Sequence, residues 1–258
     1  LHFDTAVVLA KQKEQLAILQ ANQEDAIAIA RINVNGQLGL ADDYPMSANI
    51  AINQFQPALL GNYPTAKLNV DVNIQAKFLP TLETQMQFTA RDSQWQGQPF
   101  VSKGLMLIEG SQLRNINFQA SVANNQIKAS GSLGQTNSQL DWQADFADLT
   151  KFGADYAGQA NMSGTITGTF ENLAVQFKQL AKNIRLPGGL TVATLAGQAA
   201  IMAGEDGKVA GEFNATQLTY AKHPAMDGSL TLQGTRAQHQ INITAQSKEL
   251  KFESALQG

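Results

Sequence analysis

Apolar and polar residues alternate along most of this chain with a period of two. The clearest run, Leu68–Ala76, places Val70 and Ile74 on one face and Asn69 and Asn73 on the other. Such alternation over about four to eight residues is typical of a β-strand with one apolar and one solvated face. The pattern therefore predicts β-strands along most of the chain.

A strand-turn-strand unit occurs twice, at Leu105–Gly134 and at Leu230–Gly258. In both copies two glycines lie 24 positions apart, and apolar residues alternate with Asn, Gln, Thr, Ser and Lys. The connections are short, which favours an antiparallel meander. We count roughly sixteen to eighteen strands. An open sheet of more than about ten strands tends to curl, split or close.

We therefore predict an all-β chain in which an elongated, curled antiparallel sheet encloses an apolar interior groove. A large barrel and a two-sheet sandwich are the alternatives, and the sandwich is the ordinary outcome, because alternating strands usually pack on a second sheet. The near absence of insertions and the recurring repeat favour an extended structure. We expect one elongated domain over residues 1–258. Because the chain begins in mid-pattern and stops at a repeat boundary, we interpret it as an internal fragment of a much longer protein.

Residues 1–34 allow two interpretations. Their Ala, Gln, Lys and Glu content favours a helix on propensity alone. The polar residues near position 12, however, interrupt any continuous apolar stripe. We predict three strands joined by two polar turns. The strands are Thr5–Ala10, Gln15–Ala21 and Ala26–Val34, and the turns are Lys11–Glu14 and Asn22–Asp25.

Composition and charge exclude several classes of function. Only 15% of the residues are charged, the net charge is -3, and no basic cluster could follow a phosphate backbone. Nucleic acid is therefore not an expected partner. The chain has no cysteine, so disulfide scaffolds and thiol chemistry are excluded. No apolar run approaches the ~18 residues of a transmembrane helix, and no secretory signal is visible.

Catalytic chemistry is not indicated either. His2, His223 and His239 are scattered, without metal-ligand spacing. Asp42 and Asp43 are adjacent in a loop and would not converge as an acid/base pair. We expect no enzyme activity, no cofactor and no bound metal.

From about Ile32 onward, the order and spacing of a set of short motifs resemble the TamB family of Gram-negative envelope proteins, part of the wider AsmA-like group. The likeness is weakest before that residue. The motifs are Trp95–Phe100, Lys103–Leu105, Ile127–Gly134, Leu140–Ala144, Ala147–Leu149, Gly158–Ala160, Ser163–Thr169, Leu186–Leu190 and Leu230–His239.

The resemblance implies a very long periplasmic protein with an N-terminal inner-membrane anchor and a C-terminal region that reaches the outer membrane. TamB-like proteins are implicated in moving phospholipids between the membranes and in assembling certain outer-membrane β-barrel proteins with TamA. Their fold looks like a half-pipe of strands, often called a β-taco, with an apolar interior. The anchor and the region that meets the TamA-like partner would lie outside this chain.

We expect the apolar sets of the strands to shield phospholipid acyl chains, because each exposed CH₂ costs about 0.8 kcal/mol in water. Ordinary core packing is the alternative role for each residue. The expected groove residues are Leu68, Val70, Val72, Ile74, Met86, Phe88, Ile116, Phe118, Leu140, Trp142, Phe146, Val175, Phe177, Phe213, Ile241, Ile243 and Phe252.

Two other functions remain open. A scaffold for barrel assembly could receive incoming strands at exposed sheet edges. A sugar-binding sandwich could use Trp95 and Trp142, although neither has a recurring acidic partner.

Overall fold

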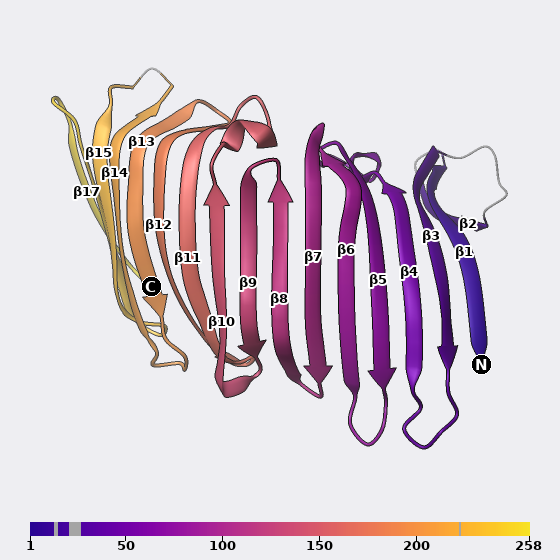
Figure 1. Ribbon diagram of the computed structural model, residues 1–258. Coiled ribbons are helices and arrows are strands. Elements are labelled where there is room, and N and C mark those ends of the chain that lie inside the picture. Colours follow the sequence, from indigo (N-terminus) through magenta and orange to yellow (C-terminus); the bar gives the residue numbers. More distant parts are fainter. Residues whose placement is uncertain (13–14, 21–26, 222) are drawn as a thin grey trace. The chain divides into compact units, whose positions relative to one another are not determined.

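The computed structural model describes residues 1–258 except 13–14, 21–26 and 222. The described residues form seventeen β-strands and two short 3₁₀ helices (Figure 1), which confirms the predicted all-β class. No helix among them is long and apolar enough to cross a membrane. The elements are β1 (His2–Gln12), β2 (Gln15–Gln20), β3 (Ile27–Leu38), β4 (Met46–Phe55), η1 (Pro57–Leu59), β5 (Ala66–Lys77), β6 (Glu83–Trp95), β7 (Gln98–Glu109), β8 (Gln112–Val122), β9 (Asn125–Leu133), β10 (Gln135–Phe146), η2 (Leu149–Phe152), β11 (Ala157–Thr169), β12 (Asn172–Leu186), β13 (Leu190–Ile201), β14 (Lys208–Tyr220), β15 (Met226–Thr235), β16 (His239–Gln246) and β17 (Lys251–Gln257).

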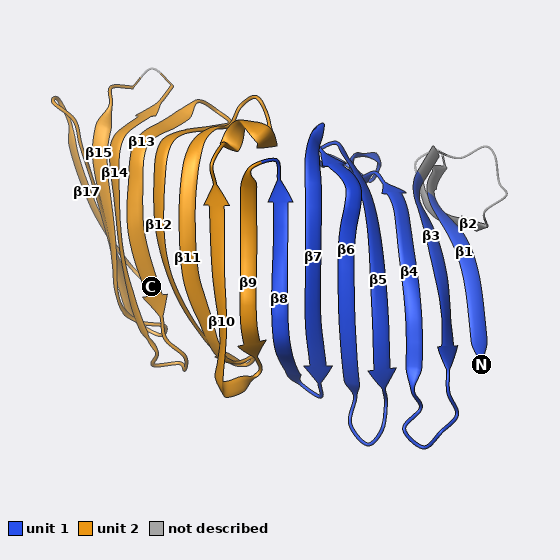
Figure 2. Ribbon diagram, viewed as in Figure 1, with its two compact units in different colours: residues 1–123 blue, residues 124–258 orange. Residues whose placement is uncertain are grey.

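The chain divides into two compact units (Figure 2). Unit 1 is Leu1–Ala123 and contains β1 to β8, and unit 2 is Asn124–Gly258 and contains β9 to β17. The expectation of a single elongated domain, internal to a longer protein, stays a prediction.

Every strand pairing within the units is antiparallel. In unit 1, β1 pairs with both β2 and β3, and each strand from β3 to β8 pairs with the next along the chain. In unit 2, each strand from β9 to β17 does the same. The predicted meander is confirmed.

The three strands expected in residues 1–34 are also confirmed, as β1, β2 and β3. The alternative that propensity favours, a helix, is wrong for the described residues of this segment. The two predicted turns, Lys11–Glu14 and Asn22–Asp25, fall partly or wholly outside the described residues.

Each unit is a single layer of strands. Among the described residues of a unit, the strands pair in one unbroken antiparallel series, so the strands of a unit belong to one sheet and not to two. A two-sheet sandwich within either unit is therefore excluded. In unit 2, β9 and β17 each pair with one strand of that unit, so its sheet is open, and Figure 1 shows that it curls.

Bulges recur in the even-numbered strands. Five non-glycine residues within these strands have a φ between 48° and 54°, and each lies at or next to a shift in pairing register. A bulge bends its strand and increases the local twist, so the repeated bulges curve the sheets. The five residues are Gln54, Asp92, Asn115, Asn183 and Gln217.

Candidate functional site

The candidate site is the apolar face of each sheet. Residues directly opposite one another in an antiparallel pair point to the same face. The pairing register therefore defines rows of side chains that run across the strands and share one face. We call the face that carries the Phe88 row in unit 1, or the Trp142 row in unit 2, the apolar face.

In unit 1 the register gathers the predicted residues into adjacent rows. Leu68 and Ile116 share their face by alternation with Val70 and Phe118. The Phe88 row is Val34, Ile50, Val72, Phe88, Gly104 and Phe118, and the rows beside it are Ile32, Ile52, Val70, Ala90 and Ser102, and Gly36, Ala48, Ile74, Met86 and Met106.

In unit 2 the Trp142 row crosses all nine strands. It consists of Ala129, Trp142, Gly164, Phe177, Ala199, Gly211, Leu232, Ile241 and Leu256. Parallel rows on the same face hold the other predicted residues. They are Leu140, Ile166, Val175, Ile201 and Val209; Met162, Gln179, Gly197, Phe213, Leu230 and Ile243; and Phe146, Ala160, Ala181, Leu195, Ala215, Gly228, Ala245 and Phe252.

Partial burial distinguishes these side chains from a dry core. Of the seventeen predicted residues none is fully buried, sixteen are half-buried, and Phe252 is 51% exposed. Apart from Phe146, which contacts Phe152 of η2, these side chains are partly covered by their neighbours in the sheet and partly open to solvent. A face of this kind can receive an apolar ligand without first displacing a packed layer.

The apolar faces also lack fixed charge. The rows above contain no Asp, Glu, Lys or Arg, whereas charged residues such as Lys178 and Glu212 point to the opposite face. Burying an unpaired charge is costly, so this separation leaves the apolar face free to be covered by hydrocarbon.

A local cover lies at one end of the unit 2 sheet. Leu149 of η2 packs against the buried cluster formed by Ala181, Ile184 and Val192. Phe152 of η2 meets the ring of Phe146 edge-on, with centroids 5.7 Å apart. Phe146 is thus the one predicted residue for which the structure shows a role in local packing under η2.

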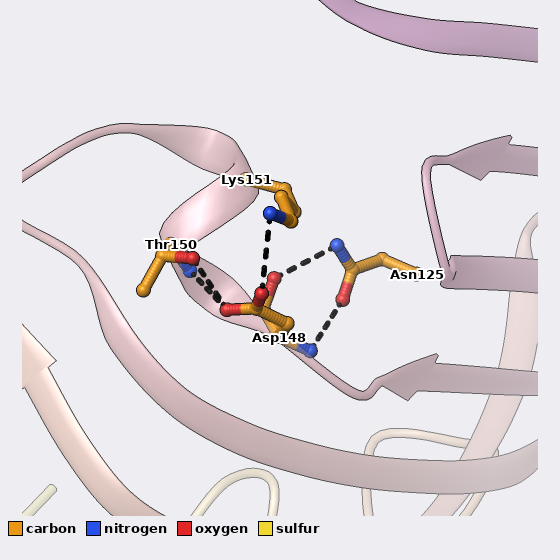
Figure 3. A network of polar contacts seen from close by, with 4 residues as sticks. All are labelled: Asn125, Asp148, Thr150 and Lys151. Carbon is orange, nitrogen blue, oxygen red and sulfur yellow. Dashed lines mark hydrogen bonds and ion pairs between the residues drawn. The ribbon is translucent and has the colours of Figure 1, made fainter.

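A polar network holds η2 in place (Figure 3). The side chain of Asn125, 2% exposed, donates to the carbonyl oxygen of Asp148 and accepts from its backbone N–H, both at 2.9 Å. The carboxylate of Asp148 accepts hydrogen bonds from the hydroxyl and the backbone N–H of Thr150 and lies 3.6 Å from the Lys151 ammonium. The Thr150 hydrogen bonds are the main reason that the pKa of Asp148 lies below its usual value.

The opposite face is polar and is tied together by amide side chains. In unit 1, Asn35, Asn49 and Asn73 are directly opposed on three strands. Asn73 Nδ2 donates to Asn49 Oδ1 at 2.7 Å, and Asn49 Nδ2 donates to Asn35 Oδ1 at 3.3 Å. This ladder agrees with the predicted orientation of the polar residues of β5.

A cavity of about 1000 Å³ lies against the unit 2 sheet, on its polar face. Each strand from β10 to β15 contributes three consecutive residues to it, such as Asp141, Trp142 and Gln143. Leu140 and Phe213, from the neighbouring apolar rows, do not line it. Successive residues of a strand point to opposite faces. The side chains just before and just after each residue of the Trp142 row therefore form the walls of the cavity, as two rows on the polar face. The backbone of the Trp142 row itself lies at the bottom of the cavity. The cavity and the apolar face are therefore opposite sides of one sheet.

Two sets of residues in the rows were not among the predicted groove residues. The first set is the apolar neighbours that complete the rows, including Met162, Ile166 and Leu232. Their alternation with polar residues was the signal that could have identified them. The second is the set of glycines within the rows, which the sequence presents as turn residues. Among the described residues, no group of three His, Asp or Glu is placed to hold a metal ion.

Comparison with known families gives one match. The profile described as "TamB, N-terminal domain" covers residues 30–258, which begins close to Ile32, where the motif resemblance begins. No curated protein and no solved structure matches the chain.

Proposed function

This chain belongs to the TamB family, and we propose that the apolar faces of its two units carry phospholipid acyl chains in transit between the inner and outer membranes. The observation that carries the proposal is an apolar face that is uncharged, half-buried and not covered by a second sheet. Hydrocarbon is the ligand that such a face favours, since each CH₂ removed from water gains about 0.8 kcal/mol.

The rows suggest how a lipid would move. Adjacent rows present similar aliphatic and aromatic side chains, so successive positions along the face bind a tail with similar free energy. An acyl tail is therefore not held strongly at any one position. The charged headgroup remains in solvent above the face, where it loses little hydration.

The wider setting follows from family membership. We propose that the chain works in the periplasm as part of a protein anchored in the inner membrane. We propose an outer-membrane TamA-like protein as the partner of that protein. We expect no catalytic step.

A charge placed on the apolar face tests the proposal. Phe213→Asp puts a carboxylate among apolar rows, whereas Asn214→Asp puts one on the polar face of the same strand. We expect the full-length Phe213→Asp protein to lose most of the phospholipid that copurifies with the wild type, measured by mass spectrometry, and Asn214→Asp to keep it. Equal loss in both variants, or in neither, contradicts the proposal. Leu232→Gln, a milder change in the Trp142 row, gives the same comparison if Phe213→Asp does not fold.

A second candidate is a scaffold for outer-membrane β-barrel assembly. The observation that favours it is the apolar side of β17, where Phe252 and Leu256 are about half exposed. Apolar residues of an incoming strand could pack there. Crosslinking of unfolded barrel proteins along β17, with no lipid on the apolar face, would favour this function over lipid transfer.

A further inference from the structure

We propose that three glycines, Gly104, Gly164 and Gly197, set the depth of the apolar face and thereby determine where an unbranched acyl chain can lie on it. The proposal rests on the lipid-carrying function above and adds the residues that shape the binding surface. It comes from the same arrangement, an aromatic ring lying over a glycine of the neighbouring strand, found in both units.

In unit 1, Gly104 lies between two phenylalanines of its row. Phe88 on β6 and Phe118 on β8 are each directly opposite Gly104 on β7. Their ring centroids are 6.0 Å apart with the planes tilted by 39°. A Cβ built on Gly104 would overlap the Phe88 ring, and the three nearest atoms to it all belong to that ring. The ring therefore occupies the place of the missing side chain.

Unit 2 repeats the arrangement. Gly164 on β11 lies between Trp142 and Phe177 in one row. A Cβ there would first meet the backbone carbonyl oxygen of Gln176 and would then come within 2.9 Å of Trp142 Nε1 and of Phe177 Cβ. In the next row, the Phe213 ring lies over Gly197 on β13. Its centroid is 6.1 Å from that of Phe177.

This packing affects how far the side chains of the apolar face rise above the backbone of the sheet. An aromatic ring that leans over a glycine stays close to the backbone, whereas a ring displaced by a side chain on that residue must take another rotamer and rise from the sheet. In unit 1 the aromatic residues lie on β6 and β8, with Gly104 on β7 between them. In unit 2 they lie on β10, β12 and β14, with Gly164 and Gly197 on β11 and β13 between them. Within each unit the apolar face therefore stays low across consecutive strands, and a linear chain can cross it.

Gly104→Ala is the cleanest test, because the three atoms nearest to the new methyl group all belong to the Phe88 ring. The matched control is Gly61→Ala, in the loop before β5 of the same unit and outside the apolar rows, where the nearest atom to a new Cβ is Tyr63 Cε2 at 3.6 Å. Each change is made in the full-length protein in cells. A photo-crosslinker at Met106 reports on both variants.

We expect Gly104→Ala to lower phospholipid capture at Met106 several-fold, and Gly61→Ala to leave capture at Met106 unchanged. The Gly104→Ala/Phe88→Leu double variant should recover capture, since it removes the ring that the methyl group displaces. Fluorine NMR of 4-fluorophenylalanine at position 88 should show a shifted resonance in Gly104→Ala.

The outcomes separate the two proposals. Absence of lipid at Met106 in the wild type would overturn the proposed function itself. Wild-type capture that Gly104→Ala leaves unchanged would overturn the role of the glycines alone. If Gly104→Ala does not fold, the double variant decides, because a folded double variant that has lost capture also contradicts a role exerted through the ring.

Discussion

Asn125 is the side chain on which the attachment of η2 depends. It satisfies both the N–H and the carbonyl of Asp148 from an almost fully buried position. Asn125→Ala leaves these two backbone groups without that partner, and we expect it to lower the free energy of unfolding by about 1–3 kcal/mol. Denaturant unfolding measures the effect, with the exposed neighbour Asn124→Ala as control. Equal stability of the two variants would show that the network does not hold η2.

The ionisation of Asp148 makes the attachment of η2 depend on pH. Its folded pKa lies below the ordinary value of 3.8, chiefly because the Thr150 side chain and then its backbone N–H donate to the carboxylate. A lowered folded pKa means that the stabilisation is complete above the unfolded pKa and is lost as the pH falls through the folded pKa. NMR titration should therefore show Asp148 ionising below pH 3.8, and Thr150→Val should move its pKa upward. A wild-type pKa at or above 3.8 would contradict this account.

Alternation along the strands was enough to assign most side chains to a face. Every residue from Leu68 to Ile74 that was predicted to be apolar-facing lies on the apolar face, and Asn73 lies on the other. Positive φ at Asp92 or Asn183 could not be predicted in the same way. Only a few per cent of non-glycine residues adopt it, and the local sequence around these two does not mark a turn.

At the scale of the strand, the bulges determine which side chains reach the apolar face. In β12, Asn183 has a φ of 52°, and Ile184 after it joins the buried cluster with Ala181. Asn183→Val places a β-branched residue in a left-handed conformation, which we expect to destabilise unit 2 by about 1–2 kcal/mol. Asn183→Gly should be nearly neutral, because glycine adopts this conformation without strain. Thermal unfolding of both variants provides the measurement, and similar losses in the two would refute a backbone cause.

Glycines also lie inside the strands. The Gly-rich stretch Ser163–Thr169 lies within β11. Interior glycine normally weakens a strand, but here the ring of Trp142 covers Gly164 from the neighbouring strand. This cross-strand cover involves residues 22 positions apart, so it could not be predicted from local pattern.

At the scale of the whole chain, the alternation predicted the class of fold, and the motif resemblance predicted the family. The absence of a second sheet within each unit could not be predicted, because an alternating strand has the same pattern in a sandwich and in a single layer. The cavity between the polar rows of unit 2 was not predicted either. It depends on the curvature of the sheet, whereas alternation only assigns those side chains to solvent.

Photo-crosslinking at neighbouring positions of opposite orientation tests the lipid-carrying function most directly. Ile74 and Ile243 lie on the apolar faces, and Asn73 and Asn242 lie beside them in the same strands on the polar faces. In the full-length protein in cells, crosslinkers at Ile74 and Ile243 should capture phospholipid, and those at Asn73 and Asn242 should not. Equal capture on both faces, or none at Ile74 and Ile243, would contradict the function proposed for this chain.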